Sequence, residues 1–247
     1  GRIAAALEAR RWEVISTGRA GTLSFDDTAN VRLALTGADA VLSSVPPSAD
    51  GDPVLATYGA DIAAHKVVYL SSTGVYGDTG GAWVDETAPT GTGRRTARAE
   101  ADASWLERGA RVLRLPGIYG PGRSALDRVR EGKAHRIDLP AQVFSRVHVD
   151  DIVSGAVAAF DAPPGAYNLA DDEPTSQNAV IEEACRLLGL EPPPLQSLDA
   201  AGLSPMARGF YAENRRVANG KARRVLGWKP RFPNYREGLR AILAGEG

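Results

Sequence analysis

Short apolar runs alternate with stretches of helical spacing along the chain. The run Lys66–Ser72 is apolar nearly throughout, which is typical of a parallel strand covered on both faces. Comparable runs predict strands at 12–16, 23–25, 40–44, 111–115 and 166–170. Apolar residues three and four apart predict helices at 2–10, 53–65, 94–108, 124–131, 151–160, 176–188, 219–227 and 234–244.

This alternation of strands and helices predicts an α/β fold with a Rossmann-type, doubly wound parallel sheet. We expect residues 1–170 to form that layer and residues 171–247 to form a small C-terminal substrate-binding part. The helix at 2–10 has no capping residue before it, and helices seldom open a domain uncapped. We therefore expect the first strand of the fold to be missing from the N-terminus.

The composition narrows the functional classes. The net charge is −1, so no overall field attracts nucleic acid or an anionic membrane. No apolar run reaches the ~18 residues of a membrane span. Cys185 is the single cysteine, which rules out an internal disulfide and favours a reducing, cytoplasmic location. His135, His148 and Asp151 lack the close spacing of metal ligands, so no metal site is predicted.

Hydroxyl side chains follow the strand Lys66–Ser72 in the stretch "YLSSTGVYGD". Ser71, Ser72 and Thr73 stand at the carboxyl end of a central strand, where open α/β sheets bind ligands. The alternative is that these hydroxyls only satisfy backbone groups in a turn.

A second candidate lies at the end of the strand 12–16, in the stretch "ISTGRAG". An acidic residue at this place would accept hydrogen bonds from the ribose of NAD. Thr17, Gly18 and Arg19 stand there instead, and a guanidinium suits a 2′-phosphate. The pattern favours NADP over NAD as the cofactor. A solvated loop arginine is the alternative interpretation.

Five motifs in order carry a family resemblance: "YLSSTGVYGD", "VLRLPGIYGPGR", "FSRVHVDDI", "YNLADDEP" and "LGWKPRF". Together they resemble the extended short-chain dehydrogenases/reductases, the group of sugar-nucleotide epimerases and dehydratases. The tail from "LSPMARGFYAENRR" onward is similar to an atypical branch of that family, whose members are described only as NAD(P)-dependent epimerases or oxidoreductases.

The resemblance implies roles for several residues. Ser72, four residues before Tyr76, would orient the reacting group of the substrate. Gly1 would be the last glycine of a phosphate-binding turn. Further cofactor contacts would come from Thr17, Arg19, Ser44, Val45, Pro46, Ser71, Pro116, Gly117 and Ile118, and substrate contacts from Thr73, Arg123 and Arg146.

The chain departs from the family at the proton-transfer pair, a Tyr followed four residues later by a Lys. None of its seven tyrosines has a Lys at that distance. Aligned through Glu100, the two positions fall on Thr92 and Thr96. Tyr76 or Tyr119 is then the remaining hypothesis for a proton relay. Arg94, Arg95 or Arg98 would supply the nearby cation.

Asp52 occupies the place of the family's catalytic Asn, although capping the helix that opens at Pro53 explains it equally well. The sequence thus predicts an NAD(P)-dependent oxidoreductase or epimerase-like protein with a degenerate active site. Its partner would be a small hydroxylated substrate, for example a nucleotide sugar. The alternative is a non-catalytic NADP-binding sensor. A homodimer through helices 52–65 and 94–108 is implied by the resemblance.

Overall fold

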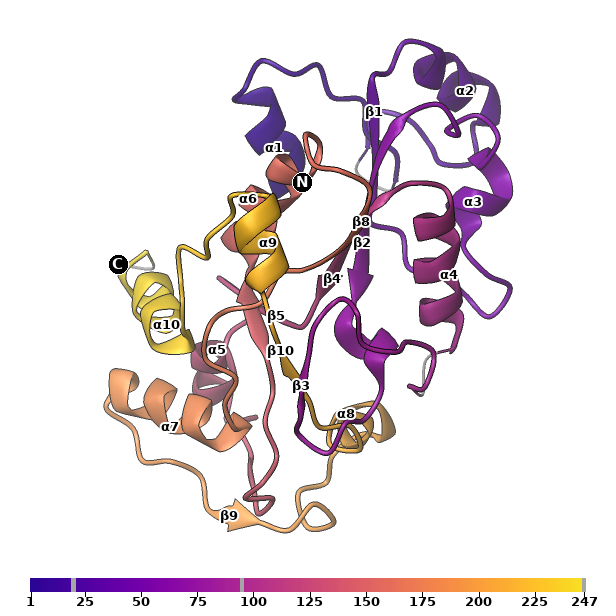
Figure 1. Cartoon of the computed structure of the whole chain (residues 1–247). Helices are drawn as coiled ribbons and strands as arrows, with labels where there is room; N and C mark the ends of the chain where they lie inside the picture. The colour runs from indigo at the N-terminus through magenta and orange to yellow at the C-terminus, as the bar shows by residue number, and fades with distance from the viewer. Residues whose placement is uncertain (19–20, 94–95, 246–247) are drawn as a thin grey trace.

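The computed structural model of the chain describes residues 1–18, 21–93 and 96–245 (Figure 1). Its centre is a four-stranded sheet in the order β1 (Ala40–Ser43), β2 (Lys66–Ser72), β4 (Arg111–Leu115) and β8 (Gly165–Asn168). All three strand pairs are parallel. The predicted α/β fold with a Rossmann-type parallel sheet is confirmed.

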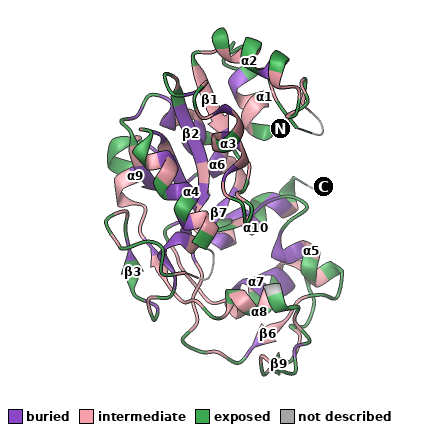
Figure 2. Ribbon diagram, turned by 90° about the vertical axis from the view of Figure 1, so that its right-hand side faces the viewer, coloured by how far each residue is buried: buried purple, intermediate pink, exposed green. Residues whose placement is uncertain are grey.

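Helices cover both faces of this sheet (Figure 1). On one side lie α1 (Arg2–Glu8), α6 (Val149–Ala159) and α9 (Gly220–Val225), and on the other lie α2 (Thr28–Thr36), α3 (Pro53–Tyr58) and α4 (Thr96–Glu107). Successive side chains of a strand point to opposite faces. Val68 accordingly joins the core under α1 and α6, whereas Val67 and Tyr69 join the core under α3 and α4. This is why β2 is coloured as buried along most of its length in Figure 2.

A third core, away from the sheet, packs α5 (Ala125–Arg130), α7 (Gln177–Leu188) and α10 (Tyr235–Ala244) together. The other elements are short: the 3₁₀ turn η1 (Thr73–Tyr76), β3 (Trp83–Val84), β5 (Gly117–Tyr119), β6 (Arg136–Ile137), β7 (Arg146–His148), β9 (Leu195–Gln196), α8 (Pro205–Phe210) and β10 (Arg216–Val217). The short strands form three two-stranded sheets, β3 with β10, β5 with β7 and β6 with β9.

Two strand predictions were wrong. Residues 12–16 have no strand partner, and 23–25 contributes only an isolated parallel bridge between Thr17 and Leu23. A strand needs a neighbour for its backbone groups, and β1 pairs only with β2 within the described residues. The helix α2, capped by Asp27, was not predicted at all. A strand before Gly1 and a division at residue 170 stay predictions.

Candidate active site

Three of the sequence-predicted segments meet at one edge of the sheet. Ser43 ends β1 beside Tyr69 of β2, and Ser72 ends β2 beside Leu115 of β4. The strands are parallel, so the segments that follow them, 44–46, 71–73 and 116–118, leave the sheet at the same edge. This is the edge at which open α/β sheets bind ligands.

Ser72 is half-buried at this edge and caps the turn η1. Its Oγ accepts a hydrogen bond of 3.1 Å from the Gly74 N–H. No other side chain among the described residues hydrogen-bonds to it, so its O–H remains able to donate to a ligand. The neighbouring Thr73, predicted to contact substrate, is only 4% exposed.

Ser71, predicted to touch the cofactor, points instead into the protein. Its Oγ donates a hydrogen bond of 2.6 Å to Asp102 Oδ2 on α4. The same carboxylate accepts two bonds from Arg114 of β4, at 3.1 Å from Nε and 2.7 Å from Nη2. Asp102 and Arg114 are 1% and 3% exposed, so this is a fully buried ion pair.

Tyr76, one hypothesised proton relay, belongs to the same buried network. Its hydroxyl accepts a hydrogen bond of 3.0 Å from Arg114 Nη1 and donates one of 2.8 Å to Asn168 Oδ1. Burial raises the pKa of the Tyr76 phenol, although the Arg114 charge opposes the shift. The hydroxyl is thus committed to two protein partners and is 1% exposed.

Tyr119, the other hypothesised relay, lies beneath α10. Its hydroxyl is buried without a hydrogen-bond partner among the described residues, and it contacts the position that a side chain of Gly238 would occupy. Burial raises the pKa of the Tyr119 phenol well above its ordinary value, and the charge of Asp171 adds to the shift. Neither tyrosine presents a hydroxyl that titrates near neutral pH.

Thr92 and Thr96 stand where the family has its Tyr and Lys. Thr92 Oγ1 donates a hydrogen bond of 2.9 Å to the Tyr76 carbonyl, which ties the preceding loop to the end of η1. Thr96 begins α4. Arg94 and Arg95 lie outside the described residues. Arg98 is occupied, because its Nη1 donates to the Tyr69 hydroxyl at 3.0 Å.

Asp52 caps α3 as the sequence allowed. Its Oδ1 accepts from the Val54 and Leu55 N–H groups at 2.9 and 3.1 Å. Its Oδ2 accepts a hydrogen bond of 2.8 Å from the indole Nε1 of Trp105. Both carboxylate oxygens therefore fasten α3 and α4, and the residue is 8% exposed.

Arg146, predicted to contact substrate, is 6% exposed. Its guanidinium donates four hydrogen bonds of 2.9–3.4 Å, to the carbonyls of Phe144, Thr175 and Ser176 and to Gln177 Oε1. Burial lowers the pKa of Arg146 to about 10. Its hydrogen bonds join β7 to the start of α7, whereas Arg123, the other predicted arginine, is exposed and makes no side-chain bond within the described residues.

The remaining cofactor candidates lie at the protein surface or beside the sheet edge. Gly1 and Thr17 are exposed, and Gly1 precedes α1 without a side-chain cap. Ser44 and Pro46 are exposed, while Val45, Pro116 and Ile118 are half-buried. Arg19 lies outside the described residues. Gly117 is exposed, and a side chain there would crowd the Ser145 carbonyl at 3.3 Å.

Sequence reasoning missed the buried partners Asp102, Arg114 and Asn168. One signal was available: Arg114 stands inside the apolar strand "RVLRL", where a charge requires a partner. The identity of that partner could not be read from the sequence, because Asp102 and Asn168 lie on different elements.

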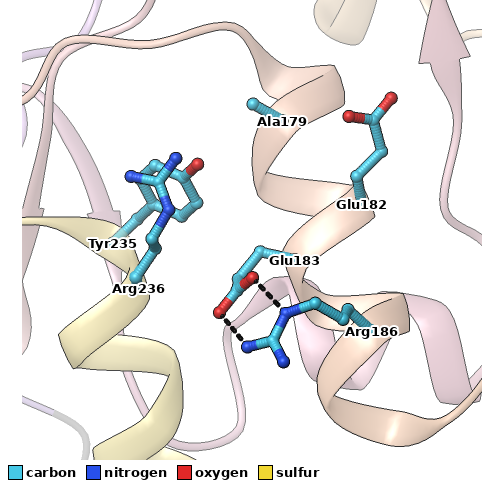
Figure 3. Close-up of a pocket in the computed structure, with 6 residues that line it drawn as sticks. All are labelled: Ala179, Glu182, Glu183, Arg186, Tyr235 and Arg236. Atoms are coloured by element: carbon cyan, nitrogen blue, oxygen red, sulfur yellow. Dashed lines mark hydrogen bonds and ion pairs between the residues drawn. The ribbon is translucent and has the colours of Figure 1, made fainter.

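A hollow of about 230 Å³ lies elsewhere, between α7 and α10 (Figure 3). Its lining includes Glu183, which pairs with Arg186 through two bonds of 2.7 Å. Arg236 at its rim is already bound to Glu173. Glu182, the remaining charged residue of the lining, is bound to Arg136, so each charge in the hollow has a partner within the protein.

Within the described residues, no cluster of His, Cys, Asp and Glu side chains could hold a metal ion. None of the helices described there is long and apolar enough to cross a membrane.

Curated relatives cover much of the chain, whereas no family model matches it. It is 36% identical over 171 residues to a 3-diazoavenalumate denitrifying reductase from Streptomyces sp, across 64% of this chain and 55% of the reductase. The match thus spans just over half of that relative. It is 30% identical over 226 residues to Protein YeeZ from Escherichia coli K12, across 81% of this chain and 74% of YeeZ.

Solved structures share the fold. A conserved protein of unknown function from Silicibacter pomeroyi superposes with a TM-score of 0.87 at 41% identity, across 98% of this chain and 94% of that one. The human epimerase family protein SDR39U1, solved with NADPH, gives a TM-score of 0.77 at 16% identity, across 98% and 95% of the two chains.

Proposed function

The chain belongs to the extended short-chain dehydrogenase/reductase family, its NAD-dependent epimerase/dehydratase-like group, and we propose that it is an NADP-dependent reductase in which Ser72 orients the substrate. One observation carries the proposal. The Ser72 hydroxyl stands at the ligand-binding edge of the sheet, anchored by one backbone N–H and with its own O–H free of protein acceptors in the described chain.

The residues at this edge fit a nicotinamide dinucleotide. Ser43, the last residue of β1, has a buried hydroxyl for which the described part of the chain provides no hydrogen-bond partner. The segment 44–46 after it is exposed or half-buried, and so is 116–118 after β4. These segments would hold the cofactor along the strand ends. When bound, a nicotinamide supplies hydride for the reduction of a neighbouring substrate.

The choice of NADP rests on Arg19 and on the absence of an acidic residue in "STGRAG". SDR39U1, a protein of the same fold, was solved with NADPH. Arg19→Ala should weaken NADPH binding by roughly ten- to a hundredfold and leave NADH binding nearly unchanged, because only NADPH carries the 2′-phosphate. Fluorescence titration of the full-length protein measures both constants. Equal losses for the two nucleotides would refute the assignment.

The side chains around Ser72 favour reduction of a substrate over its epimerisation. An epimerase must take a proton from a substrate hydroxyl, which requires a group that titrates near neutral pH. Tyr76 and Tyr119 are both buried with raised pKa values, and Thr92 is bound to a backbone carbonyl. We propose that the substrate is an acceptor that needs no proton from a side chain when it is reduced.

A diazo compound in its diazonium form is one such acceptor. Addition of hydride from NADPH to its terminal nitrogen would give a diazene, R–N=N–H, and NADP+, and loss of N2 from the diazene would leave R–H without a proton from a side chain. The Streptomyces relative is named as a denitrifying reductase of 3-diazoavenalumate. The site of this chain is compatible with that chemical class, in which Ser72 would hold the substrate by its hydroxyl.

An acceptor panel tests the proposal. Full-length protein with NADPH should reduce diazo or iminium acceptors at least tenfold faster than ketones or keto sugar nucleotides, since the latter need a proton donor. Ser72→Ala should lower kcat/KM by about ten- to a hundredfold, whereas Ser104→Ala, at a half-buried serine of α4, should not. Tight NADPH binding without turnover of any acceptor would favour the non-catalytic sensor.

A further inference from the structure

The turn that carries Ser72 is fastened at both ends to a single buried ion pair. Before the turn, Ser71 donates to Asp102 at 2.6 Å. At its end, the Tyr76 hydroxyl accepts from Arg114 at 3.0 Å. Asp102 and Arg114 are themselves joined by two hydrogen bonds. The ion pair therefore bridges the two ends of the five-residue segment 72–76.

Fixing these two ends fixes the direction of the Ser72 side chain. Adjacent residues of a strand point to opposite faces, so Ser71 held against α4 turns Ser72 the other way. The turn η1 then follows, with the Gly74 N–H bonded to Ser72 Oγ. With Tyr76 anchored four residues later, neither end of the turn can rotate without breaking a hydrogen bond to a charged group.

A contribution to folding stability does not explain why a buried ion pair, Asp102–Arg114, occupies this place. Replacing a buried ion pair by apolar residues of similar size is often neutral or stabilising, because both charges must be desolvated. An arginine can bind a carboxylate with two nitrogens and still donate from a third, which a lysine cannot do with this geometry. Arg114 uses all three nitrogens in this way, two on Asp102 and one on Tyr76.

We propose that Arg114 and Asp102 are positioning residues, and that their ion pair holds the Ser72 hydroxyl in its productive orientation through Ser71 and Tyr76. The role in turnover rests on the proposed function of Ser72. The anchoring of the turn does not, so it can be tested separately.

The first variant removes the two links between the ion pair and the turn, together with the bond from Tyr76 to Asn168. Ser71→Ala with Tyr76→Phe deletes two hydroxyl oxygens and leaves the ion pair in place. Amide hydrogen exchange in peptides covering 72–77 should accelerate about tenfold or more, because the turn opens without global unfolding. The matched control is Ser154→Ala with Tyr167→Phe, which deletes a Ser and a Tyr hydroxyl bonded elsewhere. It should leave that exchange unchanged.

Kinetic measurements test whether the Asp102–Arg114 ion pair, with Ser71 and Tyr76, affects turnover through Ser72. In the otherwise native protein, Ser71→Ala/Tyr76→Phe should lower kcat about tenfold with the NADPH dissociation constant unchanged. In a Ser72→Ala background the same pair of changes should cost less than about twofold, because coupled residues are not additive. A purely structural role would give the same loss in both backgrounds.

A second variant removes the ion pair itself. Arg114→Met with Asp102→Leu should fold, as apolar replacements of buried pairs usually do, and should show the same fast exchange at 72–77. The same substitutions in an exposed pair, Asp199→Leu with Arg208→Met, serve as the control and should leave that exchange unchanged.

Unchanged exchange at 72–77 in both network variants would overturn the anchoring, whether or not any acceptor is turned over. Accelerated exchange with equal kinetic losses in the two Ser72 backgrounds would overturn the positioning role. If the wild-type protein reduces no acceptor, the proposed function fails, and the exchange data still decide the anchoring.

Discussion

Asp171 is the buried carboxyl with the most unusual environment in the described chain. It is 2% exposed, and among the described residues neither carboxylate oxygen has a hydrogen-bond partner within 3.5 Å in good geometry. Burial raises its pKa from 3.8 to about 8. The charge of Arg146 and the backbone N–H of Glu173 oppose this increase, and the charges of Asp172 and Glu173 add to it. The folded protein therefore binds a proton at Asp171 at neutral pH that the unfolded chain releases.

This difference gives a pH-dependent stability. A folded-state pKa raised above the unfolded value means that the contribution of Asp171 is fully present below about pH 4 and is lost as the pH rises through about 8. Asp171→Asn should remove this loss, so the variant should gain on the wild type by up to about 1.4 kcal/mol per pH unit across that window. Urea unfolding at pH 5, 6.5 and 8 measures the difference.

The effect should persist at high salt, because a buried group is screened much less than a surface charge. Stability curves of wild type and Asp171→Asn that run parallel from pH 5 to 8 would contradict the raised pKa.

For single residues, the sequence indicated the chemistry of a side chain but not its burial. Ser72 could be found because a hydroxyl at the end of an apolar strand marks a ligand-binding edge. The hypotheses on Tyr76 and Tyr119 depended on exposure, which the sequence does not contain. Tyr76 is enclosed by Arg114 and Asn168, which lie 38 and 92 residues away along the chain.

At the scale of elements, Asp52 connects α3 with α4, and its loss should destabilise the fold. Asp52→Ala removes the cap of α3 and leaves the Trp105 indole N–H buried without an acceptor, a combined cost of roughly 2–4 kcal/mol. Asp27→Ala, which removes only the exposed cap of α2, should cost about 1 kcal/mol. Thermal and urea unfolding compare the two.

Measuring turnover distinguishes this structural role from a catalytic role. The catalytic role was suggested because Asp52 occupies the place of the family's catalytic Asn. The folded fraction of Asp52→Ala should retain wild-type kcat. A kcat reduced a hundredfold in protein that is still fully folded would show instead that the carboxylate takes part in the reaction.

The contact between α10 and Tyr119 gives a second prediction at this scale. In an ordinary helix interior, Gly→Ala stabilises by roughly 1 kcal/mol. A Cβ on Gly238, however, would lie 2.6 and 2.7 Å from Cε2 and Cζ of Tyr119 and would also collide with its hydroxyl. Gly238→Ala should therefore destabilise the protein by about 1–3 kcal/mol, measured by urea unfolding.

A substitution of Tyr119 tests the same contact with Gly238 from the other side. Tyr119→Phe removes a buried hydroxyl that has no hydrogen-bond partner, so it should be neutral or slightly stabilising. Combined with Gly238→Ala, it should recover part of the loss, because the two residues touch. Strict additivity of the two changes would mean that α10 and Tyr119 do not share this contact in solution.

Elements were predictable where local signals agree. Lys66–Ser72 and Arg111–Leu115 match their predicted bounds, since both are apolar and bounded by turn residues. The segment 12–16 has the same apolar character but no neighbouring strand, and pairing is not a local property. The missed helix α2 has a weak apolar pattern, with Val31 as its single fully buried residue.

At the scale of the whole molecule, the parallel sheet with helices on both faces followed from the alternation of strands and helices. The third core could not be foreseen in this way. It joins α5 from the middle of the chain to α7 and α10 from its last third. Such an assembly depends on packing between distant segments, and periodicity does not identify the partners.

In the proposed function, the protein transfers hydride from NADPH to a substrate that Ser72 orients. Isotope transfer tests this most directly: full-length protein is mixed with NADPH deuterated at both C4 positions of the nicotinamide and an iminium acceptor, whose carbon receives the hydride and keeps the deuterium in water, and the product is analysed by mass spectrometry. The account predicts deuterium in the reduced product, at a rate that falls about ten- to a hundredfold in Ser72→Ala with NADPH binding preserved. Bound NADPH with no deuterium in the product, or equal rates with and without the Ser72 hydroxyl, would contradict it.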